Sequence, residues 1–360
     1  MKKIMIGFRE GGENGGPYNS HLRIMESKLK SKFQFIPLLL PKGRLGIIGL
    51  WKILHMAKQI RAAKPDAVQI VGLEMIGAYM ILACRLANVK NIILAIHGST
   101  TEAIEFNENI FRKTIMIHVE KFTLKSAKFT FGVSDYVKTI MNVAKYSKNY
   151  IGTIYNMNHI IDSCSKRNIE RSKLDIEESK FVILSTGRIT REKGYDTLVN
   201  VIKNFKNNIN IVFVIAGNGE YLSTMELLLQ DQIGTGQVRL LGYRKDISDI
   251  LKSGDIFIMP SYHETLCMSL IEAGKAGLAL VASKVGGVKE IISDGHNGFL
   301  VESGNASEFT KKILKLYIDR ELLSLFSNNI KQTISSKFSN IEIEKKLDRL
   351  YTLATSSNNV

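Results

Sequence analysis

Several features that define other protein classes are scarce in this 360-residue chain. It has three cysteines, Cys84, Cys164 and Cys267, which are odd in number and widely spaced, so neither a disulfide framework nor a cysteine metal site is predicted. We therefore expect a protein of a reducing, cytoplasmic compartment. No apolar run reaches the roughly 18 to 20 residues that span a bilayer. The apolar stretch at the N-terminus is too short for a secretion signal.

The common phosphate-binding fingerprints are also missing. Residues 9–17 follow an expected first strand and contain four glycines, but they have neither the G-x-G-x-x-G nor the G-K-[ST] spacing. The backbone N–H groups of such a loop, next to a helix that begins near Tyr18, suit an anion. A flexible loop without a ligand explains the same residues.

The charge is distributed unevenly along the chain. Residues 1–160 contain 23 Lys and Arg against 10 Asp and Glu, whereas residues 161–360 contain 26 against 24, so the first part carries +13 of the net +15. A basic surface attracts nucleic acid or anionic lipid. The only tryptophan, Trp51, lies in the basic amphipathic segment Leu45 to Lys64, which suits an interfacial membrane helix. The same segment could instead pack its apolar stripe on a sheet.

Short apolar runs alternate with helical segments throughout, which is typical of doubly wound α/β domains. The strands expected in the first half are residues 3–8, 33–38, 67–71, 91–95, 129–132 and 150–154. Those expected in the second half are residues 181–185, 211–216, 238–241, 255–259, 279–282 and 298–301. The alternation stops over the polar residues 161–180, where we place a linker.

Charged and glycine-rich segments follow these strands at their carboxyl ends, where open α/β sheets bind ligands. After the strand at 181–185 come Gly187-Arg188 and Lys193-Gly194. Arginine can bind phosphate oxygens bidentately and lysine acts as a point charge, although a basic surface loop is the simpler explanation for this segment alone. His97 follows the strand at 91–95 and could donate to a sugar or phosphate, or could be a satisfied surface histidine.

Two glutamates, Glu264 and Glu272, follow the strand at 255–259. If the whole interval were helical, they would lie roughly 12 Å apart along the axis. That is too far for the carboxylate pair of a glycosidase, which is separated by roughly 5 to 9 Å. The two carboxylates could instead hold the two ends of an extended ligand, or could be solvated on a surface helix.

Taken in this order, the segments resemble the retaining GT-B glycosyltransferases of the group 1, family 4 type. Glu264 and Glu272 match the family's E-x7-E motif, and Gly187, Arg188 and Lys193 match its G-R-x4-K element. Gly217-Asn218-Gly219 is similar to its G-x-G turn, and residues 294–301 to its D-G-x-x-G-F-L-V segment. The resemblance is strong over residues 181–301 and looser over residues 1–160.

The resemblance implies an α/β fold of the GT-B type, in which two Rossmann-like, doubly wound parallel-sheet domains face each other across a cleft. Residues 1–160 would bind the acceptor and residues 181–340 the nucleotide sugar, with the linker at 161–180. Residues 341–360 would form a C-terminal helix or tail that packs back toward the N-terminal domain.

It also implies residue roles. The catalytic set would be Glu264, Arg188, Lys193 and His97: Glu264 and His97 would contact the donor sugar, and the two cations would neutralise the diphosphate. Glu272 would bind the ribose hydroxyls, Tyr243 and Arg244 would border the base, and glycines would approach the phosphates. The full donor-binding set is Gly15, Gly16, Gly217, Tyr243, Arg244, Thr265, Leu266, Cys267 and Glu272. No metal site is expected.

Three positions depart from the family pattern. Thr265 stands where a glycine is common, Lys289 replaces the proline before Glu290, and residues 156–158 replace an Asn-Gly-x-Asp sequence. These differences bear on donor fit and interdomain geometry, and they remove no charged contact.

The expected activity is therefore metal-independent transfer of a hexosyl-type sugar, with retention, from a UDP- or GDP-linked donor. The acceptor would be a saccharide, such as a lipid-diphosphate-linked one, in the biosynthesis of a bacterial capsule, exopolysaccharide or lipopolysaccharide. Neither a cofactor nor a nucleic-acid partner is expected, and the basic N-terminal domain would contact anionic lipid at the inner face of the cytoplasmic membrane. A non-catalytic sugar-nucleotide-binding protein, a sugar-nucleotide epimerase and a nucleic-acid-binding protein stay open as alternatives.

Overall fold

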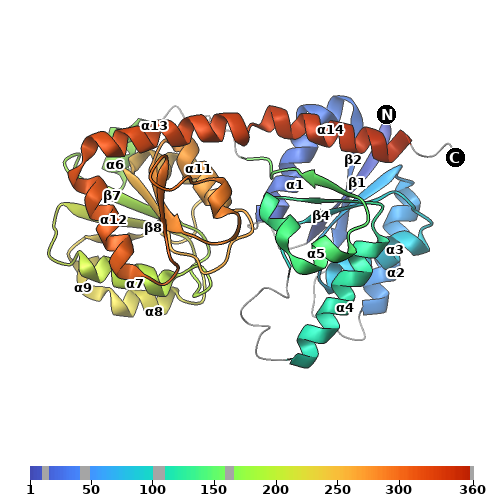
Figure 1. Ribbon diagram of the computed structural model, residues 1–360, viewed down its shortest axis with the longest axis horizontal. Helices are drawn as coiled ribbons and strands as arrows, with labels where there is room; N and C mark the ends of the chain where they lie inside the picture. The colour runs from blue at the N-terminus through green and yellow to red at the C-terminus, as the bar shows by residue number, and fades with distance from the viewer. Residues whose placement is uncertain (10–15, 41–48, 100–109, 159–165, 357–360) are drawn as a thin grey trace. The chain divides into compact units, whose positions relative to one another are not determined.

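The computed structural model describes residues 1–9, 16–40, 49–99, 110–158 and 166–356 (Figure 1). The chain divides into two compact units. Unit 1 consists of Met1–Asn158 and Ser339–Val360, and unit 2 of His159–Phe338.

Unit 1 is built on a six-stranded parallel sheet in the order β2-β1-β3-β4-β5-β6. The inner strands β3 and β4 are almost continuously apolar because helices cover both faces of the sheet. The strands are β1 (Lys2–Arg9), β2 (Phe33–Leu40), β3 (Ala67–Val71), β4 (Ile92–Ile96), β5 (Phe129–Gly132) and β6 (Tyr150–Thr153).

The helices of unit 1 form two layers. Helices α2, α3, α4 and α5 pack against one another in succession, while α14 lies beside β3 on the opposite side of the sheet from α3 and α4 (Figure 1). Their bounds are α1 (Gly16–Glu26), η1 (Lys28–Ser31), α2 (Gly49–Ala63), α3 (Met75–Leu86), α4 (Ile110–Ser126), η4 (Asp135–Thr139), α5 (Met141–Tyr146) and α14 (Asn340–Ser356).

The C-terminal helix α14 thus belongs to unit 1, although the helix before it belongs to unit 2. Its buried Tyr351 packs edge-on against the rings of Phe33 and Phe35. At the helix surface, Lys32 forms an ion pair of 2.6 Å with Asp348. The described part of residues 341–360 therefore packs on the N-terminal unit.

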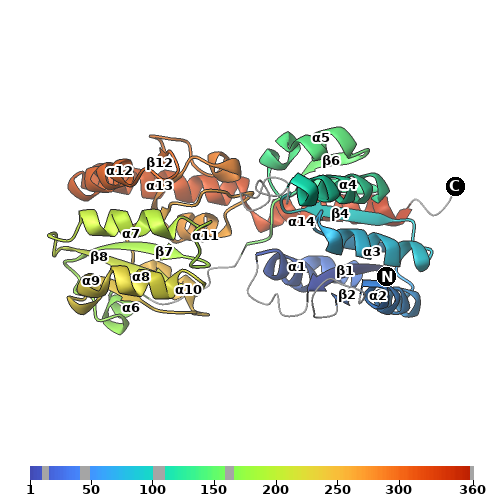
Figure 2. The same cartoon turned by 90° about the horizontal axis from the view of Figure 1, so that it is seen from below.

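Unit 2 repeats the architecture with a parallel sheet in the order β12-β11-β10-β7-β8-β9. The strands are β7 (Phe181–Thr186), β8 (Ile211–Ala216), β9 (Val238–Leu240), β10 (Ile256–Met259), β11 (Ala279–Ser283) and β12 (Gly298–Val301). Helix α12 packs beside α7, and α11 packs against α13 (Figure 2). The helices are α6 (Arg167–Lys173), α7 (Tyr195–Asn204), α8 (Leu222–Leu228), α9 (Gln230–Gly234), α10 (Ile247–Ile250), η5 (Leu251–Ser253), α11 (Met268–Ala276), η6 (Gly286–Glu290), α12 (Ala306–Ile318) and α13 (Arg320–Lys337).

All twelve strands predicted from the sequence are present, within two residues at each end. The prediction of two doubly wound parallel-sheet units is confirmed.

The prediction of a linker over residues 161–180 was wrong for the described residues 166–180, which belong to unit 2. Arg171 of α6 is fully buried there. Its guanidinium donates to the carbonyl oxygens of Ser253 and Lys180, at 3.0 and 2.9 Å, and to Oδ2 of Asp255 at 2.9 Å. A polar segment can pack in this way because each buried donor has an acceptor.

Candidate active site

The loops that follow β7, β8 and β9 are joined by backbone hydrogen bonds at the carboxyl edge of the unit 2 sheet. The N–H of Gly187 donates to Ala216 O at 3.1 Å, and the N–H of Gly217 donates to Gly242 O at 2.8 Å. A Cβ atom on Gly217 would lie 1.8 Å from Gly187 O, so a side chain at this position would force the loops apart. The G-x-G turn therefore fixes the backbone from which Arg188 projects.

A second close approach joins the loop after β7 to the segment after β10. Gly194 has a φ of 70°, and a Cβ atom there would lie 1.9 Å from Pro260 O. The N–H of Tyr262 donates to Glu192 O at 2.9 Å across the same junction. These contacts bring Lys193 beside the segment that carries Glu264.

Lys193 and Glu264 form a largely buried ion pair, with 2.8 Å between Nζ and Oε1 and side-chain exposures of 22% and 10%. The hydroxyl of Ser261 donates to the same Oε1 at 3.0 Å. Burial lowers the pKa of Lys193, but the Glu264 carboxylate opposes this effect and leaves the pKa above its ordinary value. The pair is therefore an ammonium facing a carboxylate held in one orientation.

Arg188 differs from Lys193 in its exposure. Its side chain is 70% exposed, and its ion pair with Glu192 is long, at 3.9 Å. Exposed pairs of this kind contribute only about 0 to 1 kcal/mol. The guanidinium can thus leave Glu192 at little cost in free energy and bind another anion that it holds more strongly.

The segment from Thr265 to Glu272 is only partly helical. Helix α11 begins at Met268, and Cys267 before it has an extended backbone. The interval between Glu264 and Glu272 is therefore not wholly helical, and the axial spacing of a continuous helix does not apply: Glu264 lies in the loop and the half-buried Glu272 in the helix. Leu266 and Cys267 are buried and Thr265 is half-buried.

Cys267 is a protonated thiol. Burial raises its pKa to about 12, and the nearby Glu264 carboxylate acts in the same direction. A thiolate nucleophile at this position is therefore excluded at neutral pH.

The remaining donor-binding residues of unit 2 lie in the loop after β9. Tyr243 is half exposed. Arg244 forms two hydrogen bonds with Asp246, at 2.8 and 2.5 Å. All the predicted residues of this unit thus follow one of four strands, β7, β8, β9 or β10, at a single edge of the sheet.

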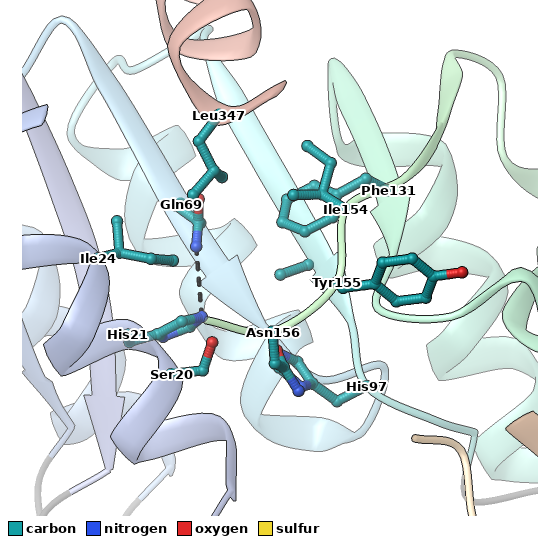
Figure 3. Close-up of a pocket in the computed structure, with 11 residues that line it drawn as sticks. Ser20, His21, Ile24, Gln69, His97, Phe131, Ile154, Tyr155, Asn156 and Leu347 are labelled. Carbon is teal, nitrogen blue, oxygen red and sulfur yellow. Dashed lines mark hydrogen bonds between the residues drawn. The ribbon is translucent and has the colours of Figure 1, made fainter. Parts of the chain in front are cut away.

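In unit 1, His97 follows β4 and lies at a small pocket (Figure 3). Burial lowers the pKa of His97 to about 3, so the imidazole is neutral, and its buried Nε2 has no hydrogen-bond partner among the described residues. The cavity of about 10 Å³ has room for about one water molecule. Polar groups around it come from Ser20, His21, Gln69, His97, Tyr155 and Asn156.

The predicted glycine loop is described only in part. Gly16 is the first residue of α1, the helix that carries Ser20 and His21 to the pocket. Gly15 lies outside the described residues.

Sequence reasoning did not identify Ser261, His21, Gln69 or Tyr351. Ser261 precedes Glu264 by three residues and could have been considered as a partner for its carboxylate. His21, Gln69 and Tyr351 are joined only by the fold, since Gln69 and Tyr351 are 282 positions apart in the sequence, and no local spacing connects them.

The described part of the chain has no group of three or more His, Cys, Asp or Glu side chains that could hold a metal ion. Among the described helices, none has both the length and the apolar character needed to cross a bilayer.

Two models of known protein families together match most of the chain. The family model described as "Glycosyl transferases group 1" matches residues 166–333, and the model described as "Glycosyl transferase 4-like" matches residues 21–131. The chain belongs to the group 1, family 4 glycosyltransferases.

Two bacterial relatives of this glycosyltransferase align over most of both chains. The UDP-Gal:alpha-D-GlcNAc-diphosphoundecaprenol alpha-1,3-galactosyltransferase of Escherichia coli is 25% identical over 88% of this chain and 82% of its own. The N,N'-diacetylbacillosaminyl-diphospho-undecaprenol alpha-1,3-N-acetylgalactosaminyltransferase of Campylobacter jejuni is 26% identical, over 84% and 81%.

The solved structures identify the fold as GT-B. Anabaena Alr3699/HepE, crystallised with UDP and glucose, superposes with a TM-score of 0.80 at 17% identity, over 98% of this glycosyltransferase and 100% of that chain. At this identity the likeness shows the architecture alone.

Proposed function

We propose that this glycosyltransferase moves a hexosyl-type sugar from a nucleotide diphosphate donor to a saccharide acceptor, with retention of the anomeric configuration. The observation that carries the proposal is the Lys193–Glu264 pair, held between two glycine-fixed loops at the carboxyl edge of the unit 2 sheet. Its ammonium supplies positive charge and its carboxylate supplies an acceptor for sugar hydroxyls within one small region.

The chemistry needs both groups. When the bond between the anomeric carbon and the diphosphate breaks, negative charge develops on the leaving oxygen. Lys193 and the exposed Arg188 would stabilise this charge, and one positioned donor is commonly worth about 3 to 4 kcal/mol. Both side-chain hydrogen bonds described for Glu264 involve Oε1, which leaves Oε2 to accept a hydrogen bond from the sugar.

Retention follows if the acceptor attacks from the face that the diphosphate leaves. The acceptor oxygen then forms its bond to the anomeric carbon, the diphosphate takes the bonding electrons, and the acceptor's hydroxyl proton passes to a departing phosphate oxygen. Glu264 is the residue that a double displacement would use as its nucleophile. The short contact of Glu264 with Lys193 favours attack from the face that the diphosphate leaves, because an ion-paired carboxylate is a weaker nucleophile.

We propose that the reaction needs neither a metal nor another cofactor, since Lys193 and Arg188 provide the positive charge. The donor would be UDP- or GDP-linked. Glu272 would hold the ribose, Tyr243 and Arg244 would border the base, and His97 of unit 1 would contact the sugar.

For the acceptor, we propose a lipid-diphosphate-linked saccharide in bacterial surface polysaccharide biosynthesis, at the inner face of the cytoplasmic membrane. The names of the Escherichia coli and Campylobacter jejuni relatives both specify a diphospho-undecaprenol compound. The excess of basic residues also lies in unit 1, the unit expected to bind the acceptor.

The surface of α2 supports membrane contact. Its inner side packs Ile53, Met56 and Ile60 into the core, while Leu50, Trp51 and Leu54 are each more than half exposed. Lys58 and Arg61 are exposed on the same helix, whereas Lys52 is buried and cannot serve as a surface cation. Exposed apolar side chains with cations nearby suit an anionic lipid surface.

Thermal denaturation with a panel of UDP- and GDP-sugars tests the donor assignment. A donor at 100 times its dissociation constant should stabilise the fold by about 2.7 kcal/mol. Turnover with that donor should persist in EDTA. Failure of every nucleotide sugar and of both free nucleotides to stabilise the protein would contradict the proposal.

A further inference from the structure

A buried hydrogen-bond network connects the C-terminal helix to the histidine pocket of unit 1. Tyr351 of α14 donates through its hydroxyl to Oε1 of Gln69 on β3, at 2.7 Å. Gln69 Nε2 lies 3.3 Å from Nε2 of His21 on α1, as the dashed line in Figure 3 marks. Nδ1 of His21 lies 3.1 Å from Gly7 O on β1. Tyr351, Gln69 and His21 are each exposed by 2% or less.

The partners fix the positions of the protons. The carbonyl oxygen of Gly7 only accepts, so Nδ1 of His21 must carry the hydrogen. Nε2 of the neutral ring then accepts, and the amide nitrogen of Gln69 donates to it. Gln69 is held in this orientation because its oxygen accepts from Tyr351. The network therefore selects one tautomer of His21, with the proton on Nδ1.

His21 in turn supports His97. The two rings meet edge to face, with 5.7 Å between their centroids. Both rings line the same small cavity, and the buried His97 Nε2 has no hydrogen-bond partner within the described parts of the chain. A change in the orientation or tautomer of His21 would change the ring edge against which His97 packs.

We propose that Tyr351 and Gln69 are positioning residues that fix the Nδ1–H tautomer of His21, and that this ring holds His97 in the orientation needed for sugar transfer. The kinetic part of the proposal rests on the proposed function, because it assigns His97 to the donor sugar. The tautomer is a property of unit 1 alone and can be measured without a substrate.

The test compares Tyr351→Phe with the matched control Thr355→Val in the full-length protein. Thr355 is also a buried hydroxyl of α14, but it bonds to the backbone of its own helix, at Tyr351 O. Nitrogen-15 NMR of the histidine rings reports the tautomer, and steady-state kinetics separates kcat from KM. Without the Tyr351 hydroxyl, the Gln69 amide can turn its oxygen toward His21 Nε2 and compete with Gly7 O for the ring hydrogen. We therefore expect Tyr351→Phe to mix the tautomers of His21 and to lower kcat on the order of tenfold with KM for the donor little changed. Thr355→Val should lower Tm, and it should leave the His21 tautomer and kcat as in the wild type.

A second variant covers the case in which Tyr351→Phe does not fold. Gln69→Glu keeps an acceptor for Tyr351, and its carboxylate replaces the amide donor with an acceptor, which favours a proton on His21 Nε2. The His21 ring signals should move accordingly, and kcat should fall.

Unchanged His21 signals and unchanged kcat in these variants, with only Tm lowered, would overturn the proposal and leave the network a purely structural one. If the wild-type protein transferred no sugar from any donor, the proposed function would fail instead. The NMR comparison would still decide whether the network sets the tautomer.

Discussion

Lys193 and Glu264, 71 residues apart along the chain, form an ion pair of 2.8 Å at the carboxyl edge of the unit 2 sheet. The pair joins the loop after β7 to the loop after β10, two strands that are neighbours in the sheet. Each partner is mostly buried, so removal of either one leaves the other buried without its counter-ion. A substitution of either residue should therefore change both the rate of sugar transfer and the stability of the protein.

Replacing Lys193 with alanine should lower kcat by about 10² to 10³, because the leaving diphosphate loses a positioned donor. The variant should also lose about 2 kcal/mol of unfolding free energy, since Glu264 remains buried without its cation. Steady-state kinetics and urea denaturation measure the two effects.

Lys284→Ala is the matched control, because Lys284 forms a longer and more exposed ion pair with Glu302, at 3.6 Å. It should change the unfolding free energy by less than about 1 kcal/mol and leave kcat unchanged. Wild-type turnover in Lys193→Ala would remove this residue from the mechanism.

Gly217→Ala should impair the donor site without changing any charge. The new Cβ would overlap Gly187 O, which must shift and carry Arg188 with it. We expect a loss of stability of about 2 kcal/mol and a higher KM for the donor. Gly234→Ala, where a Cβ meets no atom within 4 Å, should be neutral or slightly stabilising. Equal behaviour of the two variants would contradict the close packing of the loops.

Stability should fall in acid through the buried histidines of unit 1. Burial lowers the pKa of His21 from 6.5 to about 4. Between these values the unfolded chain binds a proton that the folded protein does not, so the contribution of His21 to stability is constant above about pH 6.5 and decreases toward pH 4. The slope for this one residue is about 1.4 kcal/mol per pH unit. His97, with its pKa lowered to about 3, adds to the slope in the same direction.

Urea denaturation of His21→Gln between pH 7 and pH 4.5 checks this prediction. In this variant, the slope of the unfolding free energy against pH should be smaller than in the wild type by the contribution of about one proton. His118→Gln, which changes an exposed residue of α4, should keep the wild-type slope. An unaltered slope in His21→Gln would show that His21 is not the group that titrates.

Trp51 offers a direct optical test of membrane contact, because it is the only tryptophan of the chain and is 57% exposed. Vesicles with anionic phospholipid should shift its fluorescence to shorter wavelength, and zwitterionic vesicles should do so much less. Leu54→Glu should weaken the shift, whereas Leu227→Glu, at an exposed position of unit 2, should not. No shift at low salt would favour a soluble acceptor.

The fold could be predicted almost entirely from the sequence, because the inner strands of a parallel sheet are buried on both faces and read as uninterrupted apolar runs. The sequence did not predict that the α6 segment belongs to unit 2. Its buried Arg171 is held by hydrogen bonds, and these leave no apolar pattern in the sequence. The start of α11 was also hidden: Cys267 adopts an extended backbone before this helix, which the helix-forming composition of residues 264–272 does not reveal.

For the candidate site, motif spacing placed Arg188, Lys193, Gly217 and Glu264 at strand ends, where the structure also finds them. The sequence does not reveal the direct bond between Lys193 and Glu264, nor the contact of Tyr351 with Gln69. Both depend on the order of strands or helices in space. That order is a property of the whole fold, and the local pattern of residues does not encode it.

An NMR time course of the wild-type enzyme with its donor and a diphospho-lipid-linked saccharide tests the central claim most directly. We predict that nucleoside diphosphate and glycosylated acceptor appear in equal amounts, that the new linkage has the anomeric configuration of the donor, and that EDTA changes neither rate. Inversion at the anomeric carbon, isomerisation of the donor without an acceptor, or binding of the donor without release of nucleoside diphosphate would contradict it.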